Sequence, residues 1–405
     1  MFEIMTQCFF WFVAAMLSGC AAYYMILMMA SFSRQKGLKN PKPTSTRPPK
    51  TKFLVAIPAH NEENVIKKTV ASLTQQNYPK ELFDIMVVAD HCTDKTALYA
   101  KQAQAKVFER SHLPRGSKGL ALNDLFSSID LTPYDAVVIF DADSKVAPSF
   151  LSHFDKKFLE GSSCVQGNHV IINPESGPYS ALTWAMFVSE IRLKCFGRSR
   201  LGLSSKNLGD AIAIRTDLIK SIGWGNGLAD DAEVRSRVIL KGHKIDYVHA
   251  AVSYGEATSD WQALTVQRTR WVAGTNHSNK SHRLKLLKKA IFDFDIVAFD
   301  AFIDSYLPSF SLLMLTSLSA LTLSAFASLA GLLPPLLPAI FLGLLTYFTL
   351  VPPIAIWQDG AGFRKLRYLG SGPRYILFRT KLCVLSYFGN ISSSWIPTRH
   401  GLSDK

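Results

Sequence analysis

Short apolar runs alternate with segments of helical spacing through the first third of the chain. Residues 53–58, 83–89 and 136–140 are almost wholly apolar, which is typical of strands buried in a parallel sheet. Residues 64–75 and 94–104 lie between these runs and are expected to form helices. The alternation of strand and helix predicts an α/β fold with a mostly parallel sheet that is covered by helices.

Longer apolar segments flank this α/β region. Residues 8–32 contain no charged side chain and are long enough to cross a bilayer. The absence of Lys and Arg from residues 1–7 favours a retained anchor over a cleaved signal peptide. Residues 308–333 and 335–357 are also apolar, and the two adjacent prolines at their junction predict a turn. We therefore expect an N-terminal anchor and a later transmembrane hairpin.

Two further segments mix apolar and charged residues. Residues 284–302 combine basic side chains with Ile, Phe and Val and are expected to form an amphipathic helix at the membrane interface. Residues 375–397 are interrupted by Arg379 and Lys381, so we expect them at the interface or packed against other helices. The predicted organisation is a transmembrane anchor at 1–33, a basic linker at 34–52, an α/β domain at 53–276, interfacial amphipathic helices at 277–304, a transmembrane hairpin at 305–358 and a C-terminal interfacial or membrane-packed segment at 359–405.

Charge and composition restrict the class of protein. The 405-residue chain has a formal net charge of +14 and a hydrophobic fraction of 48%, which suit neither a disordered tail nor an ordinary soluble enzyme. Its Lys and Arg residues cluster beside apolar runs, a pattern that suits anionic membrane lipids better than nucleic acid. Seven of them lie within residues 34–52. The positive-inside rule therefore places the α/β domain on the cytoplasmic side of the cell (inner) membrane.

Polar residues follow each predicted strand. Glu62 comes after the first strand, Asp90 after the second, and Asp141 and Asp143 after the third. We expect them to converge, because the carboxyl ends of parallel strands form the ligand crevice of an open sheet. A diphosphate leaving group carries charge that a divalent cation can neutralise, and hard cations prefer carboxylate oxygens. Asp141 and Asp143 therefore predict a Mg²⁺ or Mn²⁺ site, with Asp143 as the more direct ligand.

Two other motifs supply a positive charge and a candidate base. Lys118 precedes a glycine that permits close backbone approach, and its amine offers a point charge to a diphosphate. Asp230 and Asp231 form a second acidic pair, in which Asp231 is the first candidate for a general base and Asp230 the second. The structural alternatives are a surface turn at Lys118 and a helix N-terminus at the acidic pair.

A basic and aromatic string lies near the end of the α/β domain. Gln267 opens it, the guanidinium groups of Arg268 and Arg270 can bridge diphosphate oxygens, and the indole of Trp271 can stack on a sugar ring. The alternative is an amphipathic helix on lipid with the tryptophan at the interface. The lone histidines show no metal-ligand spacing and are expected at the surface or in the core: His112, His169 and His277.

In this order, the motifs resemble those of membrane-embedded family 2 glycosyltransferases, the group that includes cellulose, hyaluronan and poly-N-acetylglucosamine synthases. The resemblance extends from about Phe53 to about Gly274 and implies a GT-A catalytic domain. It implies that Asp90 accepts a hydrogen bond from uracil or ribose and that Asp141 is shared between ribose and metal. It also implies that the string ending at Trp271 is the family's Gln-x-x-Arg-Trp motif.

The chain departs from the family pattern at two places. His91 stands where many members have a second acidic residue, which puts the contacts of that loop in doubt. Ala229 and Asp230 stand where the family usually has Thr and Glu, whereas Asp231, the candidate base, is retained.

The resemblance implies an inverting, metal-dependent transferase. It would move a sugar from a nucleoside diphosphate sugar, with UDP expected, to a growing polysaccharide at the cytoplasmic membrane face. Two alternatives remain open: transfer of one sugar to a lipid or lipid-linked acceptor, and a non-catalytic nucleotide or lipid sensor. The expected partners are the sugar donor, a polysaccharide or lipid-linked acceptor, membrane lipids, and export or assembly proteins, but not nucleic acid.

Overall fold

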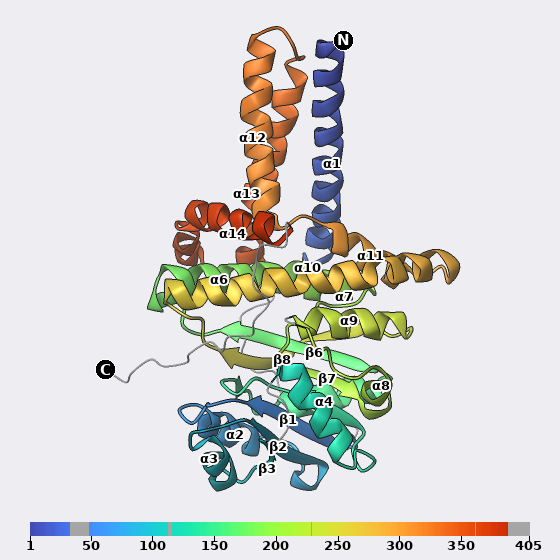
Figure 1. Cartoon of the computed structure of the whole chain (residues 1–405), viewed down its shortest axis with the longest axis vertical. Coiled ribbons are helices and arrows are strands. Elements are labelled where there is room, and N and C mark those ends of the chain that lie inside the picture. The colour runs from blue at the N-terminus through green and yellow to red at the C-terminus, as the bar shows by residue number, and fades with distance from the viewer. Residues whose placement is uncertain (33–47, 112–115, 228, 361, 388–405) are drawn as a thin grey trace. The chain divides into compact units, whose positions relative to one another are not determined.

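The computed structural model describes residues 1–32, 48–111, 116–227, 229–360 and 362–387 (Figure 1). The chain divides into two compact units, a helical unit (Met1–Gly37, Ala185–Leu201 and Tyr306–Ile391) and a sheet unit (Leu38–Trp184, Gly202–Ser305 and Ser392–Lys405). The basic linker expected at 34–52 lies outside the described residues except for 48–52. The same is true of the last expected segment beyond residue 387.

The sheet unit is built on one eight-stranded sheet with the order β3-β2-β1-β4-β7-β6-β8-β5. β1, β2, β3 and β4 pair in parallel, as do β6 and β8, whereas β7 is antiparallel to both of its neighbours and β5 is antiparallel to β8. The mixed, mostly parallel α/β sheet confirms the predicted fold class. The strands are β1 (Phe53–Ala59), β2 (Phe83–Asp90), β3 (Lys106–Arg110), β4 (Ala136–Ile139), β5 (Lys145–Val146), β6 (Cys164–Ile171), β7 (Ile212–Arg215) and β8 (Ile245–Gly255).

The side chains of the central strands alternate between two apolar cores. In β1, Phe53, Val55 and Ile57 pack into one core, and Leu54 and Ala56 pack into the other. Helices α2 (Ile66–Thr74), α3 (Thr96–Gln102) and α5 (Phe150–Leu159) contribute to the first core, and α4 (Lys118–Ser128), α8 (Thr216–Ile222) and α9 (Asp230–Leu240) contribute to the second. Because helices cover both faces of the sheet, the sequence of β1 is a continuous apolar run.

Several helices of the sheet unit begin at capping side chains. Ser117 Oγ accepts from the backbone N–H of Leu120 at 3.3 Å, and Asp260 Oδ2 accepts from that of Ala263 at 2.7 Å. The helices that begin in this unit are α2 (Ile66–Thr74), η1 (Lys80–Leu82), α3 (Thr96–Gln102), α4 (Lys118–Ser128), α5 (Phe150–Leu159), η2 (Pro174–Ser176), α6 (Pro178–Glu190), α8 (Thr216–Ile222), α9 (Asp230–Leu240), α10 (Trp261–Phe292) and α11 (Ile296–Tyr306).

The structure differs from the single helix expected at residues 284–302. α10 runs without a break to Phe292, so the expected boundary between residues 276 and 277 lies inside a helix. Phe294 adopts a left-handed backbone with φ 52°, which a helix cannot continue through. Asp295 Oδ1 then accepts from the backbone N–H groups of Val297 and Ala298 and starts α11.

In the helical unit, α1 packs against α12 and α13 through an apolar core. The ring of Phe10 lies 6.2 Å from that of Phe341, and the ring of Tyr24 lies 6.0 Å from that of Phe310. α12 and α13 lie side by side (Figure 1). The elements that begin in this unit are α1 (Phe2–Ala30), the π-helix η3 (Ile191–Gly197), α7 (Arg198–Arg200), α12 (Phe310–Leu329), α13 (Leu336–Gln358), η4 (Phe363–Leu369) and α14 (Gly372–Tyr387).

Buried polar contacts join the ends of these helices. Arg192 of η3 donates from Nη2 to the backbone oxygens of Ser31, at 3.3 Å, and Gln358, at 3.1 Å, where α1 and α13 end. Within the described part of the chain, three helical segments are long and apolar enough to cross a membrane. They correspond to the expected anchor and hairpin and are Glu3–Ala30, Phe310–Leu329 and Leu336–Gln358.

Candidate functional site

The carboxyl ends of β1, β2 and β4 meet at one edge of the sheet, as their parallel registers require. Ala59 pairs with Ala89, and Ala56 of β1 pairs with Ile139 of β4. Beyond these pairs, His60 Nδ1 lies 2.6 Å from the backbone oxygen of Asp90. The segments that carry Glu62, Asp90 and Asp141 are therefore brought together at this edge.

Asp90 belongs to a buried ion-pair cluster at the end of β2. Its Oδ1 lies 2.6 Å from Arg110 Nη1 and 2.7 Å from His91 Nδ1, and Arg110 also pairs with Asp124. Burial by itself would lower the pKa of Arg110, but Asp90 and Asp124 raise it. Because Arg110 is 1% exposed and held on β3, it fixes the Asp90 carboxylate as a hydrogen-bond acceptor in one orientation.

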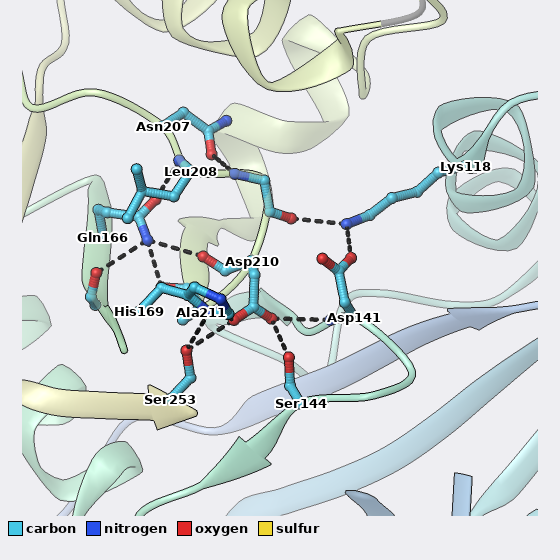
Figure 2. Close-up of polar contacts among 12 residues, drawn as sticks. Lys118, Asp141, Ser144, Gln166, His169, Asn207, Leu208, Asp210, Ala211 and Ser253 are labelled. Atoms are coloured by element: carbon cyan, nitrogen blue, oxygen red, sulfur yellow. Dashed lines mark hydrogen bonds and ion pairs between the residues drawn. The ribbon is translucent and has the colours of Figure 1, made fainter. Parts of the chain in front are cut away.

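Asp141 and Asp143 share one turn. The backbone N–H of Ser144 donates to the backbone oxygen of Asp141 at 3.2 Å and closes this turn. Lys118, the first residue of α4, forms an ion pair with the Asp141 carboxylate and donates to the backbone oxygen of Gly209 at 2.7 Å (Figure 2). Burial alone would lower the pKa of Lys118, but Asp141 and then Asp230 raise it. A positive charge is therefore fixed beside the Asp141 carboxylate.

The turn fits a cation that arrives with a diphosphate. Among the residues that the structure describes, no group of three or more His, Cys, Asp and Glu side chains could hold a metal ion. Mg²⁺, however, is usually bound through one or two carboxylates together with substrate phosphates and water. The half-buried carboxylates of Asp141 and Asp143 match that requirement, and their oxygen atoms also suit Mn²⁺.

A buried carboxylate, Asp210, joins this turn to the neighbouring strands (Figure 2). Its Oδ1 accepts from the backbone N–H of Asp141 at 2.9 Å and from Ser144 Oγ at 2.8 Å. Its Oδ2 accepts from Ser253 Oγ at 2.7 Å and lies 2.8 Å from His169 Nδ1. Burial alone would raise the pKa of Asp210, but His169, through its hydrogen bond and charge, lowers it to about 2.

The second acidic pair stands at the start of α9. Asp230 Oδ2 accepts from Trp224 Nε1 at 2.6 Å, and its Oδ1 accepts from the backbone N–H of Asp231 at 3.1 Å. Asp231 is half-buried. Burial, and then the negative charge of Asp230, raise the pKa of Asp231 to about 6. Asp231 is thus poised to gain and lose a proton near neutral pH, as a general base requires.

One loop connects the acidic pair with the turn of residues 141–144. Asn207 Nδ2 donates to the backbone oxygen of Asp231 at 3.1 Å, and Asn207 Oδ1 accepts from the backbone N–H of Gly209 at 2.9 Å. The backbone oxygen of Gly209 in turn accepts from Lys118, which pairs with Asp141. The candidate base and the candidate metal ligands therefore belong to one hydrogen-bonded assembly.

The basic and aromatic string of α10 divides between two surroundings. The half-buried Arg270 interacts electrostatically with Asp230, Asp141 and Asp231, although burial lowers its pKa. Arg268 is fully buried and donates from Nη2 to Thr183 Oγ1 of α6 at 3.0 Å. Its guanidinium carbon lies 4.3 Å from the centre of the Trp271 ring.

The structure therefore brings Arg270, but not Arg268, to the carboxylates. Arg268 instead packs on Trp271 and joins α10 to α6. Trp271 is half-buried, and Gln267 lies on the same helix, also half-buried. Of the string, Arg270 remains the candidate for diphosphate binding.

Several residues of this assembly were not among the predicted site residues, and four of them contribute polar or charged side chains that bond to a predicted residue or, in the case of His169, to Asp210. They are His169, Asn207, Asp210 and Trp224, of which His169 was expected at the surface or in the core. Asp210 stands just before β7, and β7 is antiparallel to β4, so its start meets the carboxyl end of β4. The strand-end rule would have found Asp210 if the short strand β7 and its direction had been recognised.

The arrangement can perform proton transfer beside a bound diphosphate. Lys118 pairs with Asp141, and Arg270 interacts electrostatically with Asp230, Asp141 and Asp231, so two positive charges lie among these carboxylates. Asp231 supplies a carboxylate of raised pKa in the same assembly. This chemistry suits displacement of a diphosphate by a hydroxyl group.

Comparison with known proteins identifies relatives of the sheet unit. A family model described as "Glycosyltransferase like family 2" matches residues 48–274. The chain is 28% identical over 273 residues to the probable glycosyltransferase YdaM of Bacillus subtilis (strain 168), covering 63% of each chain. It is 29% identical over 228 residues to a beta-monoglucosyldiacylglycerol synthase of Nostoc sp., covering 54% of this chain and 48% of that protein.

A third relative is a poly-beta-1,6-N-acetyl-D-glucosamine synthase of Staphylococcus aureus (strain MSSA476), 24% identical over 262 residues, with 62% of this chain and 60% of that protein covered. The match thus covers less than two thirds of each relative's length. Among solved structures, the mannosyltransferase PcManGT from Pyrobaculum calidifontis, in complex with GDP-Man and Mn²⁺, has a TM-score of 0.59 at 18% identity, covering 93% of this chain and 98% of that one. This likeness shows a GT-A-like fold.

Proposed function

We propose that this chain, which belongs to the glycosyltransferase-like family 2, is an inverting transferase that moves a sugar from a nucleoside diphosphate sugar to a hydroxyl group at a membrane face. The observation that carries the proposal is Asp231, a half-buried carboxylate with a pKa of about 6. It is connected through Asn207 and Lys118 to the turn that bears Asp141 and Asp143.

The strand ends hold the donor in this proposal. Asp90, fixed by Arg110, accepts from the nucleobase or ribose, with UDP as the expected nucleotide, and Glu62 lies at the same edge. Mg²⁺ or Mn²⁺ bound by Asp143 and Asp141 would neutralise charge on the diphosphate. The PcManGT complex, with GDP-Man and Mn²⁺ on a similar fold, supports a metal-bound nucleotide sugar. Lys118 and Arg270 add positive charge to the same place.

The reaction step belongs to Asp231. Its carboxylate accepts the proton of the acceptor hydroxyl as the oxygen forms a bond to the anomeric carbon. The bond from that carbon to the diphosphate breaks, and the diphosphate leaves with the electron pair. Attack from the face opposite the leaving group inverts the anomeric configuration. Asp230 orients the start of α9 through Trp224 and the backbone of Asp231.

The first candidate acceptor is a growing polysaccharide. The string from Gln267 to Trp271 supports it, because an indole can hold the terminal sugar of a chain while the next sugar is added. The relationship to a poly-beta-1,6-N-acetyl-D-glucosamine synthase also supports it.

The second candidate acceptor is a lipid that receives one sugar. The similarity to a beta-monoglucosyldiacylglycerol synthase supports it. Three helices able to span a membrane would hold the enzyme at the membrane that contains such a lipid. The basic residues near the first span favour a cytoplasmic site at the inner membrane. Export or assembly proteins are expected partners only for the polymer.

Nucleotide release from a panel of UDP- and GDP-sugars tests the reaction with the detergent-purified full chain. We expect metal-dependent release from at least one donor, and release about a hundredfold to ten-thousandfold slower from Asp231→Asn. Solvent extraction separates a glycolipid product from a polymer, whose length is then measured. Binding of nucleotide sugar without release from any donor would refute the proposal in favour of a non-catalytic sensor.

A further inference from the structure

Asp210 accepts four hydrogen bonds from three separate parts of the sheet unit. Two donors, the backbone N–H of Asp141 and Ser144 Oγ, belong to the turn of residues 141–144. The other two, His169 Nδ1 and Ser253 Oγ, come from β6 and β8. At 2% exposure the carboxylate has little access to water, so these four donors satisfy it.

The backbone around Asp210 is fixed by further bonds (Figure 2). Gln166 Nε2 donates to the backbone oxygen of Asp210 at 2.8 Å, and Lys118 donates to that of Gly209. Gly209 and Ala211 both have left-handed backbones, with φ of 81° and 56°. A buried alanine in this conformation is strained, and such strain persists only where surrounding contacts hold it. The segment therefore holds the carboxylate of Asp210 in one position.

A carboxylate can accept from all four donors at once. Each of its two oxygens accepts two bonds, whereas the amide of asparagine has one acceptor oxygen and one donor nitrogen. The two bonds to Oδ1 come from residues 141 and 144, which bracket Asp143. Both ends of the turn are thus tied to one buried atom.

We propose that Asp210 is a positioning residue that holds the turn of Asp141 and Asp143 in the conformation that binds a divalent cation together with a nucleoside diphosphate. The inference rests on the proposed function, because it takes the two carboxylates as the metal ligands. Asp210 acts through Asp141 and Ser144 and is not itself a ligand. Partners that orient metal ligands typically contribute about tenfold to a hundredfold in metal affinity.

The test measures metal binding without turnover. Mn²⁺ is titrated into the full-length protein in detergent with UDP, and separately with GDP, and free Mn²⁺ is followed by electron paramagnetic resonance. Asp210→Asn keeps the shape but removes one acceptor oxygen, so we expect the Mn²⁺ dissociation constant to rise about tenfold or more. Ser144→Ala removes one bond to Oδ1 and should raise it by a smaller factor.

Asp155→Asn is the matched control. Asp155 is 3% exposed and accepts from the backbone N–H groups of Lys50 and Thr51, which precede the start of β1. The turn of residues 141–144 instead follows the carboxyl end of β4, which is parallel to β1. The Asp155→Asn variant loses a similarly buried carboxylate. We therefore expect its melting temperature to fall by a comparable amount, while its affinity for Mn²⁺ stays at the wild-type value. Equal Mn²⁺ affinity in wild type and Asp210→Asn, or equal weakening in both Asn variants, would overturn the proposal. If Asp210→Asn does not fold, unchanged affinity in Ser144→Ala overturns it.

The same titration separates this inference from the proposed function. A wild-type protein that binds no Mn²⁺ with either nucleotide would overturn the metal assignment and the role of Asp210 together. A wild-type protein that binds Mn²⁺ through an Asp210-dependent turn but releases nucleotide from no sugar donor would refute the proposed function and support the positioning role.

Discussion

The acid limb of the pH profile depends on the environment of Asp231. Its pKa is raised from the ordinary 3.8 to about 6, first by burial and then by the charge of Asp230, while Lys206 and Lys118 act in the opposite direction. A general base must be unprotonated to accept a proton. Since a raised pKa extends the protonated form to higher pH, turnover should be lost as the pH falls through about 6.

The size of the loss follows from the titration. With a pKa of about 6, a carboxylate is about 91% ionised at pH 7 and about 9% ionised at pH 5, so turnover should fall about tenfold between them. With the ordinary value it would still be about 94% ionised at pH 5, and turnover would hardly change. The change in turnover between pH 7 and pH 5 therefore differs enough between the two pKa values to be resolved in a steady-state assay.

Asp230→Asn removes one of the two causes that raise the pKa of Asp231. Removing the negative charge beside Asp231 lowers the pKa of the base, so the acid limb should move to lower pH. Glu233→Gln is the control. It removes a negative charge from the same helix, but Glu233 is not among the groups that shift the pKa of Asp231. We expect its limb to stay at the wild-type pH. Asp231→Asn should lose about a hundredfold to ten-thousandfold in rate at every pH.

The assay is nucleotide release between pH 4.5 and 8 in detergent, with the fastest donor of the panel and saturating metal. Melting temperature at each pH identifies any loss caused by unfolding. An acid limb that stays in place in Asp230→Asn would refute the electrostatic reasoning. Near-wild-type turnover by Asp231→Asn would place the base elsewhere, with Asp230 as the first residue to examine.

Four further substitutions test the other parts of the site. Asp143→Ala should abolish turnover and weaken donor binding only when Mg²⁺ or Mn²⁺ is present; unchanged metal dependence in a binding titration would contradict its role. Trp271→Ala should remove about 1 kcal/mol or more of acceptor contact, so transfer should fall much more than donor hydrolysis, and equal loss of both would contradict stacking on the acceptor. Arg110→Met leaves Asp90 without its buried counter-ion and should destabilise the protein by about 3 kcal/mol, measured as a lower melting temperature; an unchanged one would contradict the buried pair. Asn207→Ala should slow transfer about tenfold through a misplaced base while donor affinity stays at the wild-type value, and lost donor affinity would show that Asn207 acts on the donor instead.

Sequence pattern predicted those features that depend on local burial. The apolar runs at β1, β2 and β4 are strands because both of their faces are covered, and the anchor and hairpin are apolar enough to span a membrane. The convergence of Asp90 and Asp141 was also predictable, since parallel strands bring their carboxyl ends to one edge whatever the loops between them do.

The break between α10 and α11 depends on two adjacent residues. The basic and apolar composition continues through residues 284–302, so periodicity alone predicts one helix. The left-handed backbone of Phe294 and the cap at Asp295 divide it. A non-glycine residue with positive φ leaves no pattern in composition.

Only the tertiary structure decided which polar residues belong to the site. Arg268 and Arg270 are equivalent in the string, but residues two apart on a helix point in different directions. The packing of α10 therefore turns Arg268 to Thr183 and Arg270 to the carboxylates. The sequence by itself predicted the α/β class, the strands β1, β2 and β4, the apolar segments long enough to span a membrane and the chemistry available at the strand ends. The role of Asp210 depends on strands that are distant in the chain and adjacent in the sheet, and that adjacency exists only after folding.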